Sequence, residues 1–209
     1  MKTPTIADVK LRTTCRICPG TELQTIMDLG TPFISDFPRR VQPRHPPTPL
    51  VVVQCKNCGL VQLLHTAPRD WMYSEYFYKS GINESMVSAL SNVVDKAITM
   101  VAVGKHDVVM DIGANDGTLL RMYKTTMEED CPLRVGIDPA VNLHKDLREH
   151  CEVIVPDYFP PEKAYIGRKA KIVTSIAMFY DLEDPNAFVA EVAKVLDDNG
   201  VWVVQFTDL

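Results

Sequence analysis

The sequence predicts an α/β protein in which a small four-cysteine domain precedes a doubly wound parallel sheet. Three observations support this prediction: two Cys-x-x-Cys pairs, a strand followed by a glycine turn at 108–120, and strand and helix patterns that alternate to the end. Such alternation is typical of parallel sheets covered by helices. A chain of 209 residues has room for one or two domains.

Four of the six cysteines form two Cys-x-x-Cys pairs, Cys15/Cys18 and Cys55/Cys58, with 36 residues between the pairs. In a cytosolic protein this spacing favours a zinc site over a disulfide framework. Four thiolates close the tetrahedral coordination shell, so the zinc would be structural and not catalytic. A redox-active Cys-x-x-Cys is the alternative, but it needs only one pair. We therefore predict a zinc-binding domain over residues 1–70.

Residues 71–105 are predicted to connect this domain to the sheet. The segment WMYSEYFYKSG at 71–81 is rich in aromatic residues and includes Tyr76 and Tyr78. Apolar residues then recur at steps of three and four up to Val101, which indicates an amphipathic helix. Asn83 or Ser85 can cap its start. We expect this helix to pack onto the sheet.

The segment VVMDIGANDGTLL at 108–120 is the pattern on which the domain at 106–209 is built. An apolar run reaches Asp111 and turns through Gly113 and Gly117. This order is typical of a buried parallel strand that passes through a tight turn into a helix. Glycine lacks the Cβ that would keep a ligand away, and ligands of open α/β sheets bind beyond the carboxyl ends of the strands. The pattern predicts a small-molecule site at 111–117.

The remaining elements follow in regular alternation and indicate a Rossmann-like sheet. Strands are expected at 107–112, 133–137, 152–155, 171–177 and 201–206. Helices are expected at 116–129, at 140–150, and from Pro185 to about Asn199-Gly200.

The composition of the turn favours a cationic ligand. It has neither the G-x-G-x-x-G of a dinucleotide site nor the Lys-Ser/Thr of a P-loop, and Asn115-Asp116 would place a carboxylate where a phosphate should lie. Like charges at short range cost free energy, whereas a sulfonium and an α-amino group would be attracted. S-adenosylmethionine fits this description, and the turn resembles the first motif of class I methyltransferases. A structural turn without a ligand is the alternative.

Further polar residues follow the carboxyl ends of the other strands. Asp138 ends the second strand, 27 positions after Asp111, where a carboxylate can accept hydrogen bonds from ribose hydroxyls. Asp157 and Tyr158 follow the third strand, where an adenine would lie, and Ser175 lies in the fourth. The predicted donor-binding residues are Asp111, Gly113, Asn115, Gly117, Asp138, Asp157, Tyr158 and Ser175.

The distribution of charge along the chain indicates which partners the protein can bind. Residues 1–70 have nine Lys and Arg against five Asp and Glu, whereas residues 71–209 have 13 against 22. A zinc ion with four thiolates would remove about two of the positive charges at the N-terminal side. Nucleic-acid binding would call for a clearly basic surface, so it is not expected. The sequence shows neither a membrane-length apolar run nor a signal peptide, and we expect a cytoplasmic protein.

The order of these motifs resembles the N-terminal half of the sugar-nucleotide C-methyltransferases, which act in deoxysugar pathways. The motifs that carry the resemblance are Cys15-Arg-Ile-Cys18, Leu29-Gly30, Cys55-x-x-Cys58-Gly-Leu-Val-Gln-Leu, Tyr76-Phe-Tyr78-Lys79-Ser80-Gly81, Asp111–Gly117 and Ser175–Pro185. The resemblance implies methylation of a carbon next to the keto group of a nucleotide-linked 4-keto-deoxyhexose. A base would remove the proton, and the enolate carbon would attack the methyl group.

The resemblance also implies catalytic residues and missing parts. Tyr76 and Tyr78 are the catalytic candidates, as phenols that hydrogen-bond the sugar or the enolate; aromatic packing is the alternative role. The family continues beyond a fifth strand, whereas this sequence stops at Leu209, so we expect either a fragment or a second chain that covers the last strand. A zinc- and donor-binding scaffold without activity and a zinc-containing RNA methyltransferase are the alternative functions.

Overall fold

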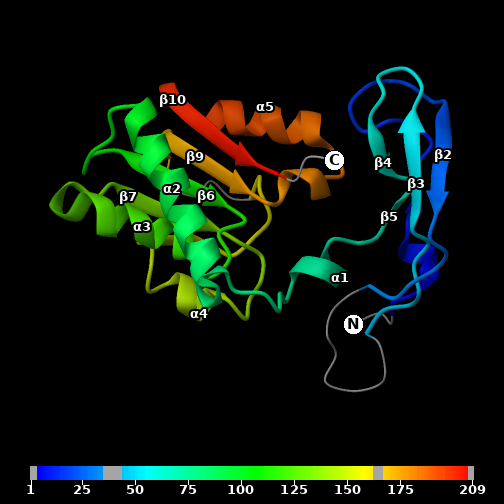
Figure 1. Cartoon of the computed structure of the whole chain (residues 1–209), viewed down its shortest axis with the longest axis horizontal. Coiled ribbons are helices and arrows are strands. Elements are labelled where there is room, and N and C mark those ends of the chain that lie inside the picture. Colours follow the sequence, from blue (N-terminus) through cyan, green and yellow to red (C-terminus); the bar gives the residue numbers. More distant parts are fainter. Residues whose placement is uncertain (1–3, 35–43, 162–166, 207–209) are drawn as a thin grey trace. The chain divides into compact units, whose positions relative to one another are not determined.

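The computed structural model describes residues 4–34, 44–161 and 167–206, which fold as two compact units (Figure 1). The first unit comprises Met1–Phe77 with Glu183–Asn186, and the second comprises Tyr78–Leu182 with Ala187–Leu209. The segment that begins at Tyr78 therefore belongs to the same unit as the larger sheet. The three-part division at 1–70, 71–105 and 106–209 stays a prediction.

The first unit consists of short antiparallel strands. Its three-stranded sheet has the order β2-β3-β4, and β1 pairs with β5. Its elements are η1 (Ile6–Asp8), β1 (Lys10–Leu11), β2 (Leu23–Asp28), β3 (Val51–Cys55), β4 (Val61–Leu63), β5 (His65–Thr66) and α1 (Asp70–Tyr73). Val53 and Cys55, on the same face of the central strand β3, are fully buried. The small core of this unit therefore lies beside the cysteines.

A segment distant in sequence completes the first unit. The Arg12 guanidinium donates to the carbonyl oxygen of Glu183 at 3.4 Å, and Asn186 Nδ2 donates to the carbonyl oxygen of Ile17 at 2.8 Å. Ile17 lies inside the first Cys-x-x-Cys pair. Residues 183–186 are thus held by the cysteine-bearing loop.

The second unit contains a five-stranded parallel sheet with the order β10-β9-β6-β7-β8 (Figure 1). Numbered along the chain, this is the doubly wound order 3-2-1-4-5 of a Rossmann-like sheet, so the predicted fold class is confirmed. The strands are β6 (Val108–Ile112), β7 (Leu133–Ile137), β8 (Val153–Val155), β9 (Ala170–Ile176) and β10 (Leu196–Gln205). All five residues of β6 are buried, as expected for a central strand with helices on both faces.

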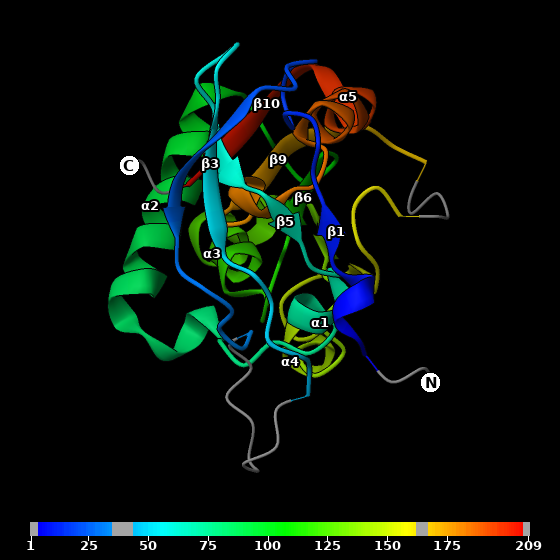
Figure 2. The ribbon, with the colours of Figure 1, turned by 90° about the vertical axis from the view of Figure 1, so that its right-hand side faces the viewer.

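Helices cover both faces of this sheet (Figure 2). The helices of the second unit are η2 (Ser80–Ile82), α2 (Glu84–Met100), α3 (Thr118–Met127), η3 (Glu128–Asp130), α4 (His144–Leu147), η4 (Phe179–Asp181) and α5 (Pro185–Val195), the first two residues of which belong to the first unit. Buried residues of α2, α3 and α4 form one core cluster with Val109, whereas those of α5 form a second cluster with Val108 and Met110. Alternate residues of β6 therefore serve opposite faces. Within the described part of the chain, every helix is too short or too polar to cross a bilayer.

Two predicted helices are shorter than expected. The helix expected at 140–150 is reduced to α4, because Leu143 N–H bonds to the Ala140 carbonyl and His150 N–H to the Leu147 carbonyl, three residues back in each case. Helix α5 ends at Val195 instead of near Asn199. The next residue, Leu196, already pairs with Ala170 of β9. Within β10 the Asp197 carboxylate accepts the Asn199 N–H at 2.9 Å, a local bond that competes with helix.

Candidate functional site

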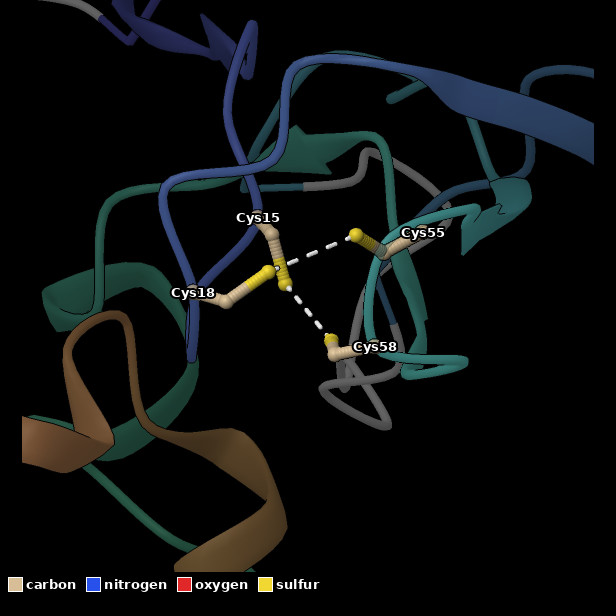
Figure 3. Close-up of side chains that lie close together, drawn as sticks. All are labelled: Cys15, Cys18, Cys55 and Cys58. Carbon is tan, nitrogen blue, oxygen red and sulfur yellow. Dashed lines mark hydrogen bonds between the residues drawn. The ribbon is translucent and has the colours of Figure 1, made fainter.

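The four paired cysteines converge on one point (Figure 3). Their sulfur atoms all lie within 4.8 Å of one another, with Cys15 Sγ 3.7 Å from Cys58 Sγ and Cys18 Sγ 3.6 Å from Cys55 Sγ. Sulfurs that are each about 2.3 Å from a tetrahedral zinc lie about 3.8 Å apart. All four thiols are free and none forms a disulfide. The cluster thus has the ligand set and spacing of a structural zinc site.

The surrounding donors stabilise thiolate forms. The N–H groups of Ile17 and Gly20 approach Cys15 Sγ and Cys18 Sγ at 3.4 Å each, and Asn57 Nδ2 donates to Cys18 Sγ at 3.3 Å. The bond from Asn57 is the main reason why the pKa of Cys18 falls to about 6.

The neighbouring sulfurs have the opposite effect at Cys58. The backbone bond from Leu60 lowers its pKa, but hydrogen bonds with Cys18 and the other thiols, together with desolvation, raise it to about 12. Four adjacent thiolates repel one another unless a cation lies among them. Zinc bound by Cys15, Cys18, Cys55 and Cys58 resolves this conflict, and the donor set fits it.

Arg16 ties the first cysteine pair to the neighbouring strands. Its N–H donates to Gln62 Oε1 at 2.9 Å, and its guanidinium donates to the Leu63 carbonyl at 2.7 Å and to Thr66 Oγ1 at 2.8 Å. The first Cys-x-x-Cys loop is therefore bonded to the strands β4 and β5, which follow the second loop.

The glycine turn lies at the topological switch point of the larger sheet. Strand β6 pairs with β7 on one side and with β9 on the other, and the chain reverses its direction of winding between them. Ligands of doubly wound sheets bind in the crevice at this point. Gly113 and Gly117 have φ values of 78° and 81°, a region that glycine adopts without strain. A Cβ on Gly113 would lie 3.3 Å from the Met178 side chain, which follows β9.

Asp111 does not present its carboxylate at the open end of the sheet. It is buried, and its Oδ1 accepts a hydrogen bond of 2.6 Å from Thr174 Oγ1 on β9. Desolvation raises its pKa to about 7, since the bond from Thr174 only partly offsets burial and the charge of Asp138 adds to the shift. Asp111 is therefore only partly charged at neutral pH.

Asp138 anchors the turn from the neighbouring strand. Its Oδ2 accepts the Asn115 N–H and its Oδ1 accepts the Ala140 N–H, both at 2.8 Å. Desolvation raises its pKa, although these two backbone bonds oppose the shift. The Ile137 carbonyl accepts from the N–H groups of Gly113 and Ala114 at 2.9 and 3.1 Å. The turn and the end of β7 therefore form one connected structure.

The side chains of Asn115 and Asp116 bind the segment that precedes α2. Asn115 Oδ1 accepts the Ser80 N–H at 2.9 Å, and its Nδ2 donates to the Tyr78 carbonyl at 3.0 Å. Asp116 Oδ2 accepts the Gly81 N–H at 2.8 Å. The acidic turn that the sequence suggested for a cationic ligand thus makes specific contacts within the protein.

The other predicted site residues are less directly connected to the turn. Ser175 is fully buried, and its Oγ accepts from Trp202 Nε1 at 3.2 Å. Asp157 Oδ1 accepts the Tyr158 N–H at 2.7 Å, directly after the edge strand β8. Tyr76 belongs to the first unit, where its ring lies 5.3 Å from that of Phe77. The structure therefore joins residues 113–117 to Asp138 and Tyr78. The roles of all the predicted donor-binding and catalytic residues stay predictions.

Sequence reasoning missed three contributors to the turn. Thr174 bonds Asp111, Met178 faces Gly113, and Gly81 lies against Asp116. Gly81 and Met178 lie within motifs that carry the family resemblance, at 76–81 and 175–185, but neither motif reveals the contact with the turn.

One protein family and one curated relative are similar to parts of this chain. Residues 15–73 match a family described as "Putative zinc binding domain". The C-methyltransferase NovU of Streptomyces niveus is 24% identical over 201 residues, which cover 91% of this chain and 46% of NovU. The chain thus spans about half the length of this curated relative. The family match and the converging sulfurs confirm the predicted zinc site, and the similarity to NovU confirms the predicted resemblance to C-methyltransferases.

Two solved structures are similar to the chain over more than half its length. The plantazolicin methyltransferase BpumL, in complex with a pentazolic desmethylPZN analog and SAH, is 12% identical, with a TM-score of 0.48 over 59% of this chain and 48% of BpumL. Streptomyces venezuelae DesVI is 19% identical, with a TM-score of 0.42 over 58% of this chain and 50% of DesVI.

Proposed function

We propose that this chain is the zinc- and donor-binding part of a C-methyltransferase that uses S-adenosylmethionine. The observation that carries the proposal is a glycine turn at the switch point of a doubly wound sheet, joined to Asp138, in a chain similar to a C-methyltransferase over 201 residues. The proposed substrate is a nucleotide-linked 4-keto-deoxyhexose, as the motif resemblance implies. The zinc would have a structural role.

The residues present fit the methyl donor. Gly113 lacks a Cβ at the switch point, where an added Cβ would lie 3.3 Å from the Met178 side chain, and Asp138 follows β7, where a carboxylate can bind ribose hydroxyls. Each Asp138 oxygen accepts one backbone N–H and retains a second lone pair for a hydroxyl group. When bound there, S-adenosylmethionine would supply an electrophilic methyl group.

The chain's own contribution to the chemistry would come from Tyr78 and Tyr76. In C-methylation a proton leaves the carbon next to a ketone, and negative charge develops on the ketone oxygen. A phenol that donates a hydrogen bond to this oxygen would stabilise the enolate. Tyr78 is supported for this role because its backbone is bonded to the glycine turn; Tyr76 has ring contacts with Phe77 and Tyr73, which also suit a packing role.

Two other functions make different predictions. An RNA methyltransferase would need a basic surface, whereas residues 71–209 have an excess of nine negative charges. A donor-binding scaffold would bind S-adenosylhomocysteine but transfer no methyl group.

The test is methyl transfer from isotope-labelled S-adenosylmethionine to a TDP-4-keto-deoxyhexose, followed by mass spectrometry of the sugar. The expected product is a sugar that carries the labelled methyl group on the carbon next to the keto group. Binding of S-adenosylhomocysteine without product would favour the scaffold, and product formed only with a second chain present would indicate a split enzyme. Label in RNA but not in the sugar would contradict the proposal.

A further inference from the structure

We propose that Asn115 and Asp116 are positioning residues that hold the segment 78–81 on the glycine turn, and do not themselves attract the methyl donor. The contact between segment 78–81 and the turn is a property of the fold, whereas its role in catalysis rests on the proposed function. Four consecutive residues of this segment, Tyr78 to Gly81, each form a hydrogen bond or ion pair with the turn or with α4.

The geometry at Asn115 explains why an amide occupies this position. Its side chain binds the carbonyl of Tyr78 and the N–H of Ser80, two residues further on, as a neighbouring strand would. Only a side chain with both a donor and an acceptor can do this, which aspartate cannot when ionised. Asn115 also has a φ of 53°, a left-handed conformation that asparagine tolerates better than most residues.

Asp116 and Gly81 form the second half of the contact. One carboxylate oxygen of Asp116 accepts the Gly81 N–H, and the other accepts the Thr118 N–H at 3.1 Å at the start of α3. A Cβ on Gly81 would lie 2.8 Å from Thr118 Oγ1 and 3.0 Å from Asp116 Oδ2. The segment therefore reaches the turn only because residue 81 is glycine.

Lys79 adds an ion pair from the side of α4. Its Nζ lies 2.5 Å from Asp146 Oδ2, and both side chains are more than one-third exposed. An exposed pair of this kind contributes little to stability. The hydrogen bonds to Asn115 and Asp116 therefore dominate the hold on segment 78–81.

The consequence concerns Tyr78, the catalytic candidate whose backbone is fixed by Asn115. If Asn115 is replaced by glycine, the φ of 53° and the bond from its N–H to Asp138 remain available, and only the side-chain contacts are lost. The donor site should then persist while Tyr78 becomes mobile. The turnover number should therefore fall, while the affinity for the methyl donor should stay nearly unchanged.

The first experiment is hydrogen exchange at the amides of Ser80 and Gly81 in the zinc-loaded full chain, measured by mass spectrometry. Asn115→Gly should accelerate exchange across 79–82 by about tenfold or more, because at least one hydrogen bond is lost. Gly81→Ala should accelerate exchange to a similar extent. Because both substitutions break the same contact, the acceleration in the double variant should be smaller than the product of the two single accelerations. Glu128→Gly is the matched control, since Glu128 also has a positive φ of 48° but an exposed side chain at the end of α3.

The second experiment separates positioning from charge. Asn115→Asp makes the turn more acidic but removes the N–H group that donates a hydrogen bond to the Tyr78 carbonyl. We expect faster exchange across 79–82 and a turnover number reduced about tenfold, as in Asn115→Gly, with affinity for S-adenosylhomocysteine changed less than about threefold. The inference would be overturned if Asn115→Gly left amide exchange across 79–82 unchanged. It would also be overturned if Asn115→Asp bound the methyl donor more tightly while segment 79–82 stayed protected. Absence of methyl transfer by the unaltered chain would instead contradict the proposed function, and the exchange result would still decide whether Asn115 holds the segment.

Discussion

The cysteine cluster and the glycine turn differ in what their side chains do. At the cluster, four sulfurs point at one another and leave a site for one ion. At the turn, the polar side chains of Asp111, Asn115 and Asp116 point into the protein and bond Thr174 and the segment 78–81. Polar residues in a motif thus have two uses: they can bind a ligand directly, or they can build the backbone surface on which a ligand lies.

Loss of the metal should have the largest effect and should separate the two regions. Cys55 is fully buried, and within the described residues 4–34 and 44–77 the other buried residues are Cys15, Val53 and Gln62. Cys55→Ser should therefore abolish zinc binding and unfold this unit. Structural zinc contributes about 10–16 kcal/mol to small domains. Zinc content by elemental mass spectrometry and hydrogen exchange in β2–β4 measure the two effects. Cys131→Ser, outside the cluster, should keep one zinc per chain; full zinc retention in Cys55→Ser would contradict a four-cysteine site.

The glycine turn should respond to added bulk instead. A Cβ on Gly117, where φ is 81°, would lie 2.8 Å from the His150 Cβ and 3.0 Å from Leu147 Cδ1. Gly117→Ala should therefore lower the free energy of unfolding of the second unit by about 2–4 kcal/mol through strain and overpacking. At Gly104, a Cβ would meet nothing within 4 Å, so Gly104→Ala should change this free energy of unfolding by less than about 1 kcal/mol. Urea unfolding followed by Trp202 fluorescence in a Trp71→Phe background measures both, and equal effects would contradict the geometry.

A smaller effect should appear in the pH dependence of the second unit. Burial raises the pKa of Asp111 from its ordinary 3.8 to about 7, so between these values the folded chain binds more protons than the unfolded chain. The contribution of Asp111 to stability should therefore be fully present below about pH 3.8 and be lost as pH rises towards about 7, with a slope of up to about 1.4 kcal/mol per pH unit.

Asp111→Asn keeps an acceptor for Thr174 but does not titrate, so it should flatten this slope. The same urea experiment between about pH 5 and pH 8 measures it, in a range where Asp111 changes charge. A slope that persists unchanged in Asp111→Asn would assign the pH dependence to another group.

The sequence was sufficient for the zinc site and for the doubly wound class of the sheet. Cys-x-x-Cys spacing determines which ligands can meet, and the buried run at 108–112 followed by glycine determines where a strand ends. These features depend on local spacing. The short α4 and the early end of α5 were missed because turns at Ala140 and Asp197 compete with helix through bonds that residue periodicity does not reveal.

The direction of the acidic side chains could not be predicted in the same way. Whether Asp116 faces a ligand or the Gly81 N–H depends on where a segment 35 residues earlier returns to the turn. Likewise, the burial of Asp111 depends on Thr174, which is 63 residues away. Pairings across such distances are a property of the tertiary structure. The sequence therefore located the turn but not the role of each of its side chains.

Calorimetric titration of the zinc-loaded chain with S-adenosylhomocysteine tests most directly whether the turn binds a methyl donor. We predict saturable heat with one site per chain, and clearly weaker binding by Gly113→Val, whose side chain would occupy space beside Met178. No heat at millimolar ligand, which corresponds to less than about 4 kcal/mol of binding free energy, would contradict the account.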